Sequence, residues 1–316
     1  MSKVLFGVDL GGTTVKIGLF TETGDLTEKW EIPTDTSEKG KNIPKDIAEA
    51  ILAKMREKGI EKENVLGVGM GIPGPVDDKG IVAGCANLGW GRMNVAQTMN
   101  ELTGLNFVPG NDANVAALGE MWKGGGRGYE NVIMVTLGTG VGGGIIVGGK
   151  VIAGCCGCGG EIGHIIVNPE ETAVCGCGGH GHLEQYASAT GVVRLAKIEL
   201  EKNAENSALR GLEKITAKTV FDAAKAGDAL ALRVVDRYGW YLALALGAVA
   251  CTVDTEIFVI GGGMSRAGQI IIDAVEKYYG KNLMPALQNR KFALAELGND
   301  AGIYGSAKLL LSTLEQ

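Results

Sequence analysis

The chain has 316 residues, 46% of them hydrophobic and 21% charged, with 51 glycines and a formal net charge of −6. This length favours two domains, and the glycine content favours many tight turns between strands. An acidic chain offers no basic surface for nucleic acid, so no nucleic-acid partner is expected. The longest apolar stretch, 240–253, is too short to span a bilayer and is expected to be a buried helix. With no leader at the N-terminus, we expect a cytoplasmic protein without a membrane partner.

Residues 3–32 predict two or three strands, with a hairpin turn at Gly24-Asp25. Apolar residues at helical spacing then predict an amphipathic helix over 41–58 that ends at Gly59. The rest of the N-terminal part predicts, in chain order, a strand over 65–72, a rigid turn over 73–77, a short helix over 95–102, a strand end at 106–109 and a helix over 113–122.

The C-terminal part predicts a second group of strands and a mainly helical region. The expected elements are a strand over 131–137, a hairpin from 138 to 152, helices over 184–253, a strand over 255–260 and helices over 265–279 and 301–314. We therefore expect a small N-terminal α/β lobe (residues 1–122), completed by a C-terminal helix (301–316), and a large α/β lobe (residues 123–300).

One pattern occurs twice: an apolar strand, a turn of glycine and threonine, and a second apolar strand. It covers residues 4–20, with the turn at Gly11-Gly12-Thr13, and residues 132–147, with the turn at Gly138-Thr139-Gly140. Glycine has no Cβ, so such turns expose backbone N–H groups to an approaching ligand, and rows of N–H groups favour phosphate. One such turn in each half predicts two lobes that bind one polyphosphate.

Other glycine motifs fit less well. Residues 138–143 match the dinucleotide fingerprint G-x-G-x-x-G, but a strand follows where that motif requires a helix. Residues 144–150 have the spacing of a P-loop, but Val151 stands where serine or threonine is needed. A protein-kinase glycine loop fits the hairpin, yet no H-R-D or D-F-G triplet follows. A third glycine turn, 261–263, either connects a strand to a helix or lets a flat ring such as adenine approach the backbone.

The three glycine motifs, in this order, resemble the superfamily of sugar kinases, actin and heat-shock chaperone ATPases. Four further stretches, 71–77, 111–120, 160–164 and 175–184, resemble the ROK (repressor, ORF, kinase) family. The resemblance covers the chain from Val4 to the last helix. It implies an α/β, two-lobed, actin-like ATPase fold (RNase H-like) with ATP and sugar in the interdomain cleft, and a homodimer.

The resemblance also implies roles for single residues. The residues expected to bind the cofactor ATP are Asp9, Gly11, Gly12, Thr13, Gly138, Thr139, Gly140, Gly261 and Gly262. Those expected to bind the sugar are Gly74, Asn87, Asn111, Asp112, Glu161, His164 and Glu184. Asp112 matches the family's catalytic base, which takes the hydroxyl proton during phosphoryl transfer. An aspartate before an alanine-rich helix is also a common helix cap, and Asn111 can fill that role instead.

The implied activity is ATP-dependent phosphorylation of a hexose with Mg²⁺. Residues 86–90 are similar to bacterial glucokinases, which favours the 6-hydroxyl of glucose. Fructose, mannose or N-acetylmannosamine remain alternative substrates. A regulator that binds a hexose without turnover is the alternative of another class; Asp112 and the lack of a DNA-binding segment disfavour it.

Seven cysteines in a reducing compartment are unlike a disulfide framework. His164, Cys175, Cys177 and His182 have residue types and spacing that fit a closed tetrahedral zinc site. The family has a third cysteine where His182 stands, so His180 remains the rival fourth ligand. The family usually has small or polar residues where this chain has Cys155, Cys156 and Cys158, which we expect to be small buried residues in a tight turn.

Overall fold

A computed structural model of the chain describes residues 3–77 and 79–314, so Glu315 and Gln316 of the expected C-terminal helix lie outside the described residues. The chain divides into two units. Unit 1 comprises Met1–Glu130, Gly144–Gly160 and Leu297–Gln316, and unit 2 comprises Asn131–Gly143 and Glu161–Glu296.

This division differs from the expected lobes of residues 1–122 and 123–300, because strand β9 (Val141–Val147) passes from unit 2 into unit 1. A Cβ on Gly144 would lie 2.5 Å from the Cβ of Ala117, so the second half of β9 packs closely on helix α3 (Asp112–Lys123) of unit 1.

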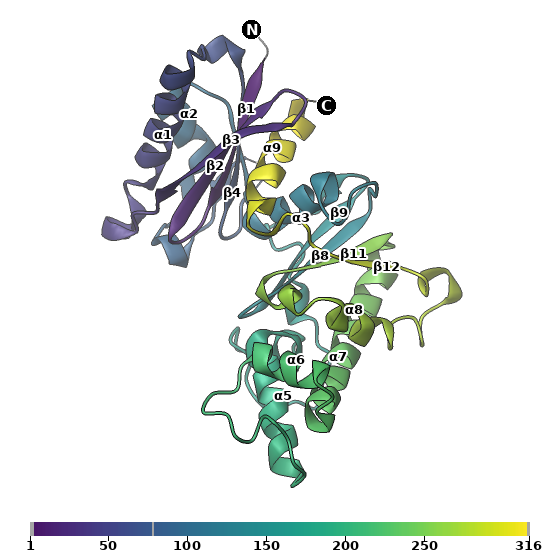
Figure 1. Cartoon of the computed structure of the whole chain (residues 1–316). Coiled ribbons are helices and arrows are strands. Elements are labelled where there is room, and N and C mark those ends of the chain that lie inside the picture. The colour runs from purple at the N-terminus through teal and green to yellow at the C-terminus, as the bar shows by residue number, and fades with distance from the viewer. Residues whose placement is uncertain (1–2, 78, 315–316) are drawn as a thin grey trace. The chain divides into compact units, whose positions relative to one another are not determined.

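Unit 1 contains a five-stranded sheet with helices on both faces (Figure 1). Its strands, in spatial order, are β3 (Leu26–Pro33), β2 (Thr14–Thr21), β1 (Val4–Leu10), β4 (Val65–Ile72) and β7 (Phe107–Asn111). The first three form an antiparallel meander, and β4 and β7 join in parallel. The other elements of this unit are α1 (Ile43–Lys58), α2 (Val95–Thr103), α3, α9 (Ala301–Leu314) and the short strands β5 (Ile81–Val82), β6 (Met93–Asn94) and β10 (Lys150–Val151).

Alternation along β1 explains the two cores of unit 1. Phe6 and Val8 belong to one core together with Ile47 of α1, whereas Leu5 belongs to the other core together with Ile303 of α9. Successive side chains of a strand point to opposite faces, so α1 and α9 cover opposite faces of the sheet. Helix α1 ends as predicted at Gly59, which adopts the left-handed conformation (φ +63°) that favours glycine at this position.

The second sheet repeats the strand order of the first. Its order is β10, β9, β8 (Val132–Leu137), β11 (Ile257–Gly261) and β12 (Lys291–Leu294). In each sheet the spatial order starts with the third strand of a meander and continues with the second and then the first strand of that meander. Two strands from later in the sequence follow, and they pair in parallel. The repeat seen in the sequence is therefore also a repeat in topology.

The helices of unit 2 are α4 (Glu184–Ala187), α5 (Ala189–Lys202), α6 (Ala217–Lys225), α7 (Ala229–Val253) and α8 (Gln269–Glu276). Helix α7 contacts α5, α6 and α8. The expected helix over 265–279 begins later, because a short 3₁₀ turn, η5 (Gly263–Ala267), ends at Gly268 with φ +78°.

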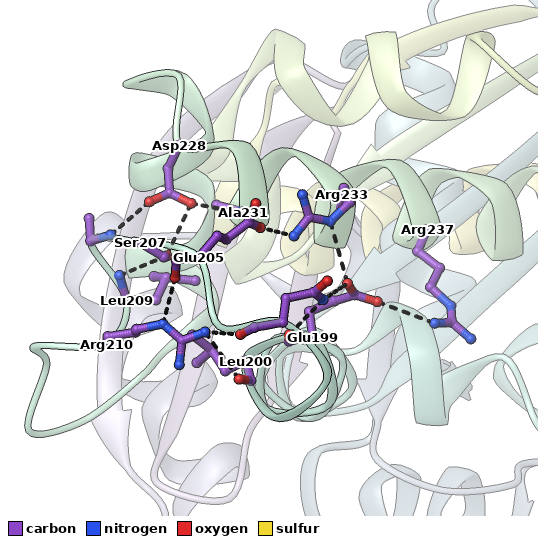
Figure 2. Close-up of polar contacts among 12 residues, drawn as sticks. Glu199, Leu200, Glu205, Ser207, Leu209, Arg210, Asp228, Ala231, Arg233 and Arg237 are labelled. Atoms are coloured by element: carbon purple, nitrogen blue, oxygen red, sulfur yellow. Dashed lines mark hydrogen bonds and ion pairs between the residues drawn. The ribbon is translucent and has the colours of Figure 1, made fainter.

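A polar network fixes the loop between α5 and α6 (Figure 2). Arg210 donates to the carbonyl oxygens of Leu200 at 3.2 Å and Glu205 at 2.8 Å. The carboxylate of Asp228, which caps α7, accepts hydrogen bonds from Ser207 and Ala208 of the same loop. The first half of the loop is therefore held between the end of α5 and the start of α7.

The expectation of a buried helix over 240–253 is partly wrong. Trp240 is 45% exposed and Leu244 47% exposed, while Tyr241 and Leu242 are buried. One side of α7 faces the core of unit 2 and the other carries apolar side chains on the surface. In the part of the chain that the structure describes, no helix is both long and apolar enough to cross a membrane.

Candidate active site

The first glycine turn joins β1 to β2 and is open to solvent. Gly12 and Thr13 are exposed, and no atom lies within 4 Å of the place where a Cβ on Gly12 would stand. The hydroxyl of Thr34 donates to the carbonyl oxygen of Gly11 at 2.7 Å, and the Gly11 amide donates to the carbonyl of Thr14 at 3.1 Å. A turn held in this way can present its N–H groups to an anion.

Asp9 lies at the end of β1, beside this turn. A Cβ on Gly302 would lie 2.4 Å from the carboxyl carbon of Asp9, so the carboxylate packs directly against the first turn of α9. Burial raises the pKa of Asp9, nearby Lys16 lowers it, and the charge of Asp112 raises it; the net shift is upward. Asp9 and Asp112 are therefore close enough to interact electrostatically, and a cation bound beside them would relieve their repulsion.

Asp112 is the first residue of α3, and the residue that caps this helix is Asn111. The Asn111 side-chain oxygen accepts a hydrogen bond from the amide of Asn114 at 3.1 Å. Oδ1 of Asp112 accepts from the amide of Ala113 at 2.8 Å and from Nδ2 of Asn111 at 3.1 Å. The question left open by the sequence is thus resolved: the cap is Asn111.

The amide group of Asn111 also connects two loops of unit 1. Its Nδ2 donates to the carbonyl oxygen of Gly74 at 3.0 Å, in the turn that follows β4. Gly74 has φ +106°, a conformation that favours glycine. Asn111 therefore links the Gly74 turn to the Asp112 carboxylate through the two hydrogen bonds of its Nδ2. Gly74 takes part in this link through its backbone carbonyl.

Asn87 lies exposed on a short 3₁₀ turn, η3 (Ala86–Leu88). The turn is closed by Cys85 and Trp90, whose backbones pair at 2.9 and 3.0 Å. The indole of Trp90 is buried and donates to the carbonyl of Gly40 at 2.9 Å. Asn87 is therefore an exposed amide on a firmly anchored loop.

The second glycine turn, in unit 2, is tied to Glu184. Oε2 of Glu184 accepts a hydrogen bond from the amide of Val141 at 3.0 Å. A Cβ on Gly140 would lie 2.4 Å from that oxygen, so an alanine there would displace the carboxylate. Gly138, by contrast, has open space at its Cβ position, and Thr139 is exposed.

The segment that carries Glu161 and His164 also packs on Val141. A Cβ on Gly163 would lie 2.1 Å from the carbonyl oxygen of Val141, so only glycine permits this contact. Glu161 is exposed, and its Oε2 lies 3.9 Å from Nε2 of His164. In unit 2 the predicted sugar-binding residues Glu161, His164 and Glu184 are thus joined to one another through the backbone of Val141.

A pocket of about 480 Å³ opens beside the second glycine turn. Gly138 and Thr139 line it together with Thr216, Phe221, Met264 and Arg266. The last four were missed from the sequence. Thr216 gave the only local indication, because its side chain caps α6 in a threonine-based capping box, and that pattern indicates a helix start rather than a ligand.

The third glycine turn contributes to this pocket through Gly263. Gly262 has φ +82°, and a Cβ there would lie 2.4 Å from the carbonyl oxygen of Leu137. A Cβ on Gly261 would lie 2.9 Å from the side chain of Met134. Gly261 and Gly262 therefore pack against β8, and of the three glycines it is Gly263 that faces the pocket.

The four predicted metal ligands lie together in unit 2. The ligand atoms of His164, Cys175, Cys177 and His182 are all within 4.8 Å of one another. Sγ of Cys177 lies 3.2 Å from Nδ1 of His182. Nδ1 of His164 is buried and has no hydrogen-bond partner among the described residues. A group of two thiols and two imidazoles fits a tetrahedral metal site, and a metal would satisfy such an unpartnered nitrogen.

Local turns place these ligands, and His180 points elsewhere. The amide of Cys175 donates to the carbonyl of Gly179 at 2.7 Å, closing the turn that carries both thiols. Nδ1 of His180 lies 3.2 Å from the carbonyl oxygen of Ala173. The fourth member of the group is therefore His182, and Cys175 also lies 3.9 Å from Oε1 of Glu184.

Comparisons with known proteins agree over the whole chain. A family model described as the ROK family matches residues 5–313. A protein named glucokinase from Halalkalibacterium halodurans is 41% identical over 309 residues, covering 96% of this chain and 94% of that protein.

Two solved structures are also similar. A ROK family glucokinase from Streptomyces griseus, in complex with glucose and AMPPNP, is 34% identical with a TM-score of 0.71 and covers 97% of this chain and 98% of its own. A ROK hexokinase from Thermus thermophilus is 30% identical with a TM-score of 0.79 and covers 99% and 98%. These likenesses confirm the predicted α/β, actin-like fold class.

Proposed function

Because this chain belongs to the ROK family, we propose that it transfers the γ-phosphoryl group of ATP to the 6-hydroxyl of glucose. The chain is an ATP-dependent sugar kinase, since it matches glucokinases at 41% and 37% identity over almost its full length. The observation that carries the mechanism is the hydrogen bond from Nδ2 of Asn111 to the carboxylate of Asp112 at the start of α3. A kinase needs a base at the acceptor hydroxyl, whereas a sugar-binding regulator does not.

Asp112 is the proposed base. Phosphoryl transfer leaves little covalent chemistry to the protein, so the base accepts the hydroxyl proton and orients the oxygen for attack. The hydrogen bonds from Asn111 and Ala113 to Oδ1 fix the carboxylate in one orientation. Asn111 is a positioning residue in this account, because its amide is bonded to Gly74, Asp112 and Asn114.

The two glycine turns are proposed to bind ATP. Gly11, Gly12, Thr13, Gly138, Thr139 and Gly140 supply backbone N–H groups to the phosphates, and the 480 Å³ pocket receives the nucleoside, with Gly261 and Gly262 supporting Gly263 from behind. Asp9, whose pKa is raised by burial, would lie beside the Mg²⁺ that accompanies ATP, and the ion would supply positive charge there. Gly74, Asn87, Glu161, His164 and Glu184 bind the sugar, since vicinal hydroxyls suit carboxylate and amide partners.

Asp112→Asn tests the base directly. The variant keeps the size of the side chain and a hydrogen-bond acceptor, so glucose binding should persist. Removal of a general base costs on the order of 10²- to 10⁴-fold in kcat. Glu161→Gln is the matched control, because it should weaken glucose affinity before it affects kcat. Wild-type kcat in Asp112→Asn would reduce Asp112 to the first residue of a helix and overturn the mechanism.

We also propose that the group of His164, Cys175, Cys177 and His182 binds one Zn²⁺. When bound, the ion would cross-link the segment that carries His164 and Glu184, because all four positions are filled by protein. Elemental analysis of freshly purified protein should find about one zinc per chain, and Cys177→Ser should lose it while Cys251→Ser keeps it. A stable, metal-free preparation would show that the cysteines serve packing alone.

A homodimer is the assembly that the family resemblance implies, and we propose it here. Trp240 and Leu244 on α7 give unit 2 an exposed apolar surface that a second copy would cover. Light scattering should give twice the 32.8 kDa mass of the chain, and a monomer at micromolar concentration would refute the proposal.

A further inference from the structure

The segment after β10 carries three cysteines that the proposed function does not use. Cys155, Cys156 and Cys158 are all exposed, unlike Cys85 and Cys175. The expectation of small buried residues is therefore wrong for this turn. The turn folds back on itself, with the amide of Gly159 bonded to the carbonyl of Ala153 at 2.7 Å, which leaves the thiols on its outside.

Two of these thiols lie next to each other. The Sγ atoms of Cys155 and Cys156 are 3.4 Å apart, and Sγ of Cys158 lies 3.8 Å from the carbonyl oxygen of Cys156. Bonds from a soft centre to sulfur are about 2.3 Å long, so one atom can bond both neighbouring sulfurs without rearrangement of the turn. Among the described residues, no histidine or carboxylate joins these thiols in a four-ligand group, which disfavours a zinc site.

The dithiol adjoins the loops that hold Asn111. Cys155 lines a cavity of about 650 Å³ in unit 1 that Asn111 also lines. A Cβ on Gly157 would lie 3.0 Å from the amide nitrogen of Val76, so the turn packs against the chain just after Gly74. Gly74 in turn accepts the hydrogen bond from Asn111. A group bound to the thiols would therefore lie next to the loops that position Asp112.

The raised pKa of Cys156 adds to the geometry in identifying a ligand for the two neighbouring thiols. A hydrogen bond with Cys155 raises the pKa of Cys156, which favours the protonated form of the Cys156 thiol. Peroxides react with the thiolate, so a thiol with a raised pKa is a poor target for them. A soft electrophile whose oxygen is replaced by the two thiol sulfurs does not need a thiolate, because the departing oxygen takes up both thiol protons.

We propose that Cys155 and Cys156 form a chelating site for trivalent arsenicals, and that its occupation inhibits the kinase. The second part rests on the proposed function. With phenylarsine oxide, two As–S bonds replace the arsenic–oxygen bond, and the oxygen leaves as water with both thiol protons. Arsenic stays trivalent and no oxidant is consumed.

Intact-mass spectrometry of the whole chain treated with phenylarsine oxide tests the site without reference to activity. Wild type should carry one more arsenical per chain than Cys155→Ser or Cys156→Ser. That adduct should resist a monothiol, because two thiols on one chain hold arsenic more tightly than single thiols do. It should be removed by 2,3-dimercaptopropanol, which is itself a chelating dithiol. Cys158→Ser and Cys251→Ser, both changes at exposed cysteines, are the matched controls and should keep the adduct.

Equal uptake by wild type and Cys155→Ser would overturn the site, as would loss of the adduct in Cys158→Ser. Thermal unfolding of each variant, with Cys155→Ala as a second substitution, shows whether the fold is kept. Glucose phosphorylation measured on the same samples should be lost in treated wild type and kept in treated Cys155→Ser. Uptake without inhibition would overturn the link to Asn111. If the untreated chain did not phosphorylate glucose, the proposed function would be refuted. The difference in arsenical uptake between wild type and Cys155→Ser would then decide by itself whether the dithiol site exists.

Discussion

The two strand–turn–strand repeats have the same topology, but their turns are supported in different ways. The first turn is closed by its own backbone and by Thr34, and Gly12 faces open space. The second is also closed by its own backbone, since the amide of Gly138 donates to the carbonyl of Gly140 at 3.0 Å. In addition, the amide of Val141 donates to Glu184, and the carbonyl of Val141 packs on Gly163. The two turns therefore differ in what holds them from outside, which is Thr34 in unit 1 and, in unit 2, Glu184, a residue proposed to bind the sugar.

The largest effect in this comparison is expected on KM for ATP, and it tests whether both turns bind phosphate. In Gly138→Val and Gly12→Val the new side chain meets no atom within 4 Å at its Cβ, so folding should be unchanged. The branch would block phosphate from the N–H groups. Each charge-assisted hydrogen bond lost is worth about 1.5–3 kcal/mol, and we expect KM for ATP to rise about 10- to 100-fold.

Gly211→Val is the control, since Gly211 also has open space at its Cβ and lies outside both turns. Steady-state kinetics at saturating glucose would measure the change. If only Gly138→Val raised KM for ATP, the first turn would share the topology of the second without sharing its function.

A medium effect is expected where the turns differ. Gly140→Ala places a Cβ 2.4 Å from Oε2 of Glu184 and should break the hydrogen bond to Val141. That loss should cost about 1–3 kcal/mol and lower Tm by about 2–10 °C. KM should rise for both ATP and glucose, whereas Gly138→Ala should leave Tm unchanged. An unaltered Tm in Gly140→Ala would mean that Glu184 does not brace the turn.

The smallest effect concerns the carboxylate beside the first turn. The folded pKa of Asp9 lies above its unfolded value, because burial is the largest cause of its shift. Near neutral pH the charged, buried Asp9 therefore lowers the free energy of unfolding. This destabilisation disappears as the pH falls through the folded pKa and the carboxylate becomes protonated. Asp9→Asn should raise the free energy of unfolding at pH 7, and the gain should shrink towards pH 4.

Urea unfolding at several pH values measures this difference, and Asp25→Asn serves as the control because the Asp25 side chain is 71% exposed. Kinase activity should fall in Asp9→Asn while stability rises, the trade-off typical of a functional group held at a cost. A variant less stable than wild type at pH 7 would show that the charged Asp9 is stabilised by its surroundings.

Much of this molecule could be predicted from local patterns. Alternation, helical spacing and glycine caps were sufficient for elements such as β1, α1 and α9. The repeat in the sequence predicted two lobes, and the structure adds that the two sheets share one strand order. Contacts between distant segments could not be predicted in the same way. The bond from Glu184 to Val141, the packing of Gly144 on Ala117 and the pocket position of Arg266 depend on tertiary structure, which no spacing of residues records. The exposure of Cys155 was missed for the same reason.

The central claim is phosphoryl transfer from ATP to glucose, and release of ADP across a panel of hexoses tests it most directly. The panel contains glucose, fructose, mannose, N-acetylmannosamine and a reaction without sugar, with the product identified by NMR. The account predicts the highest kcat/KM with glucose, and glucose 6-phosphate as the product. ADP release that does not depend on any hexose, or a higher kcat/KM with another sugar of the panel, would contradict it.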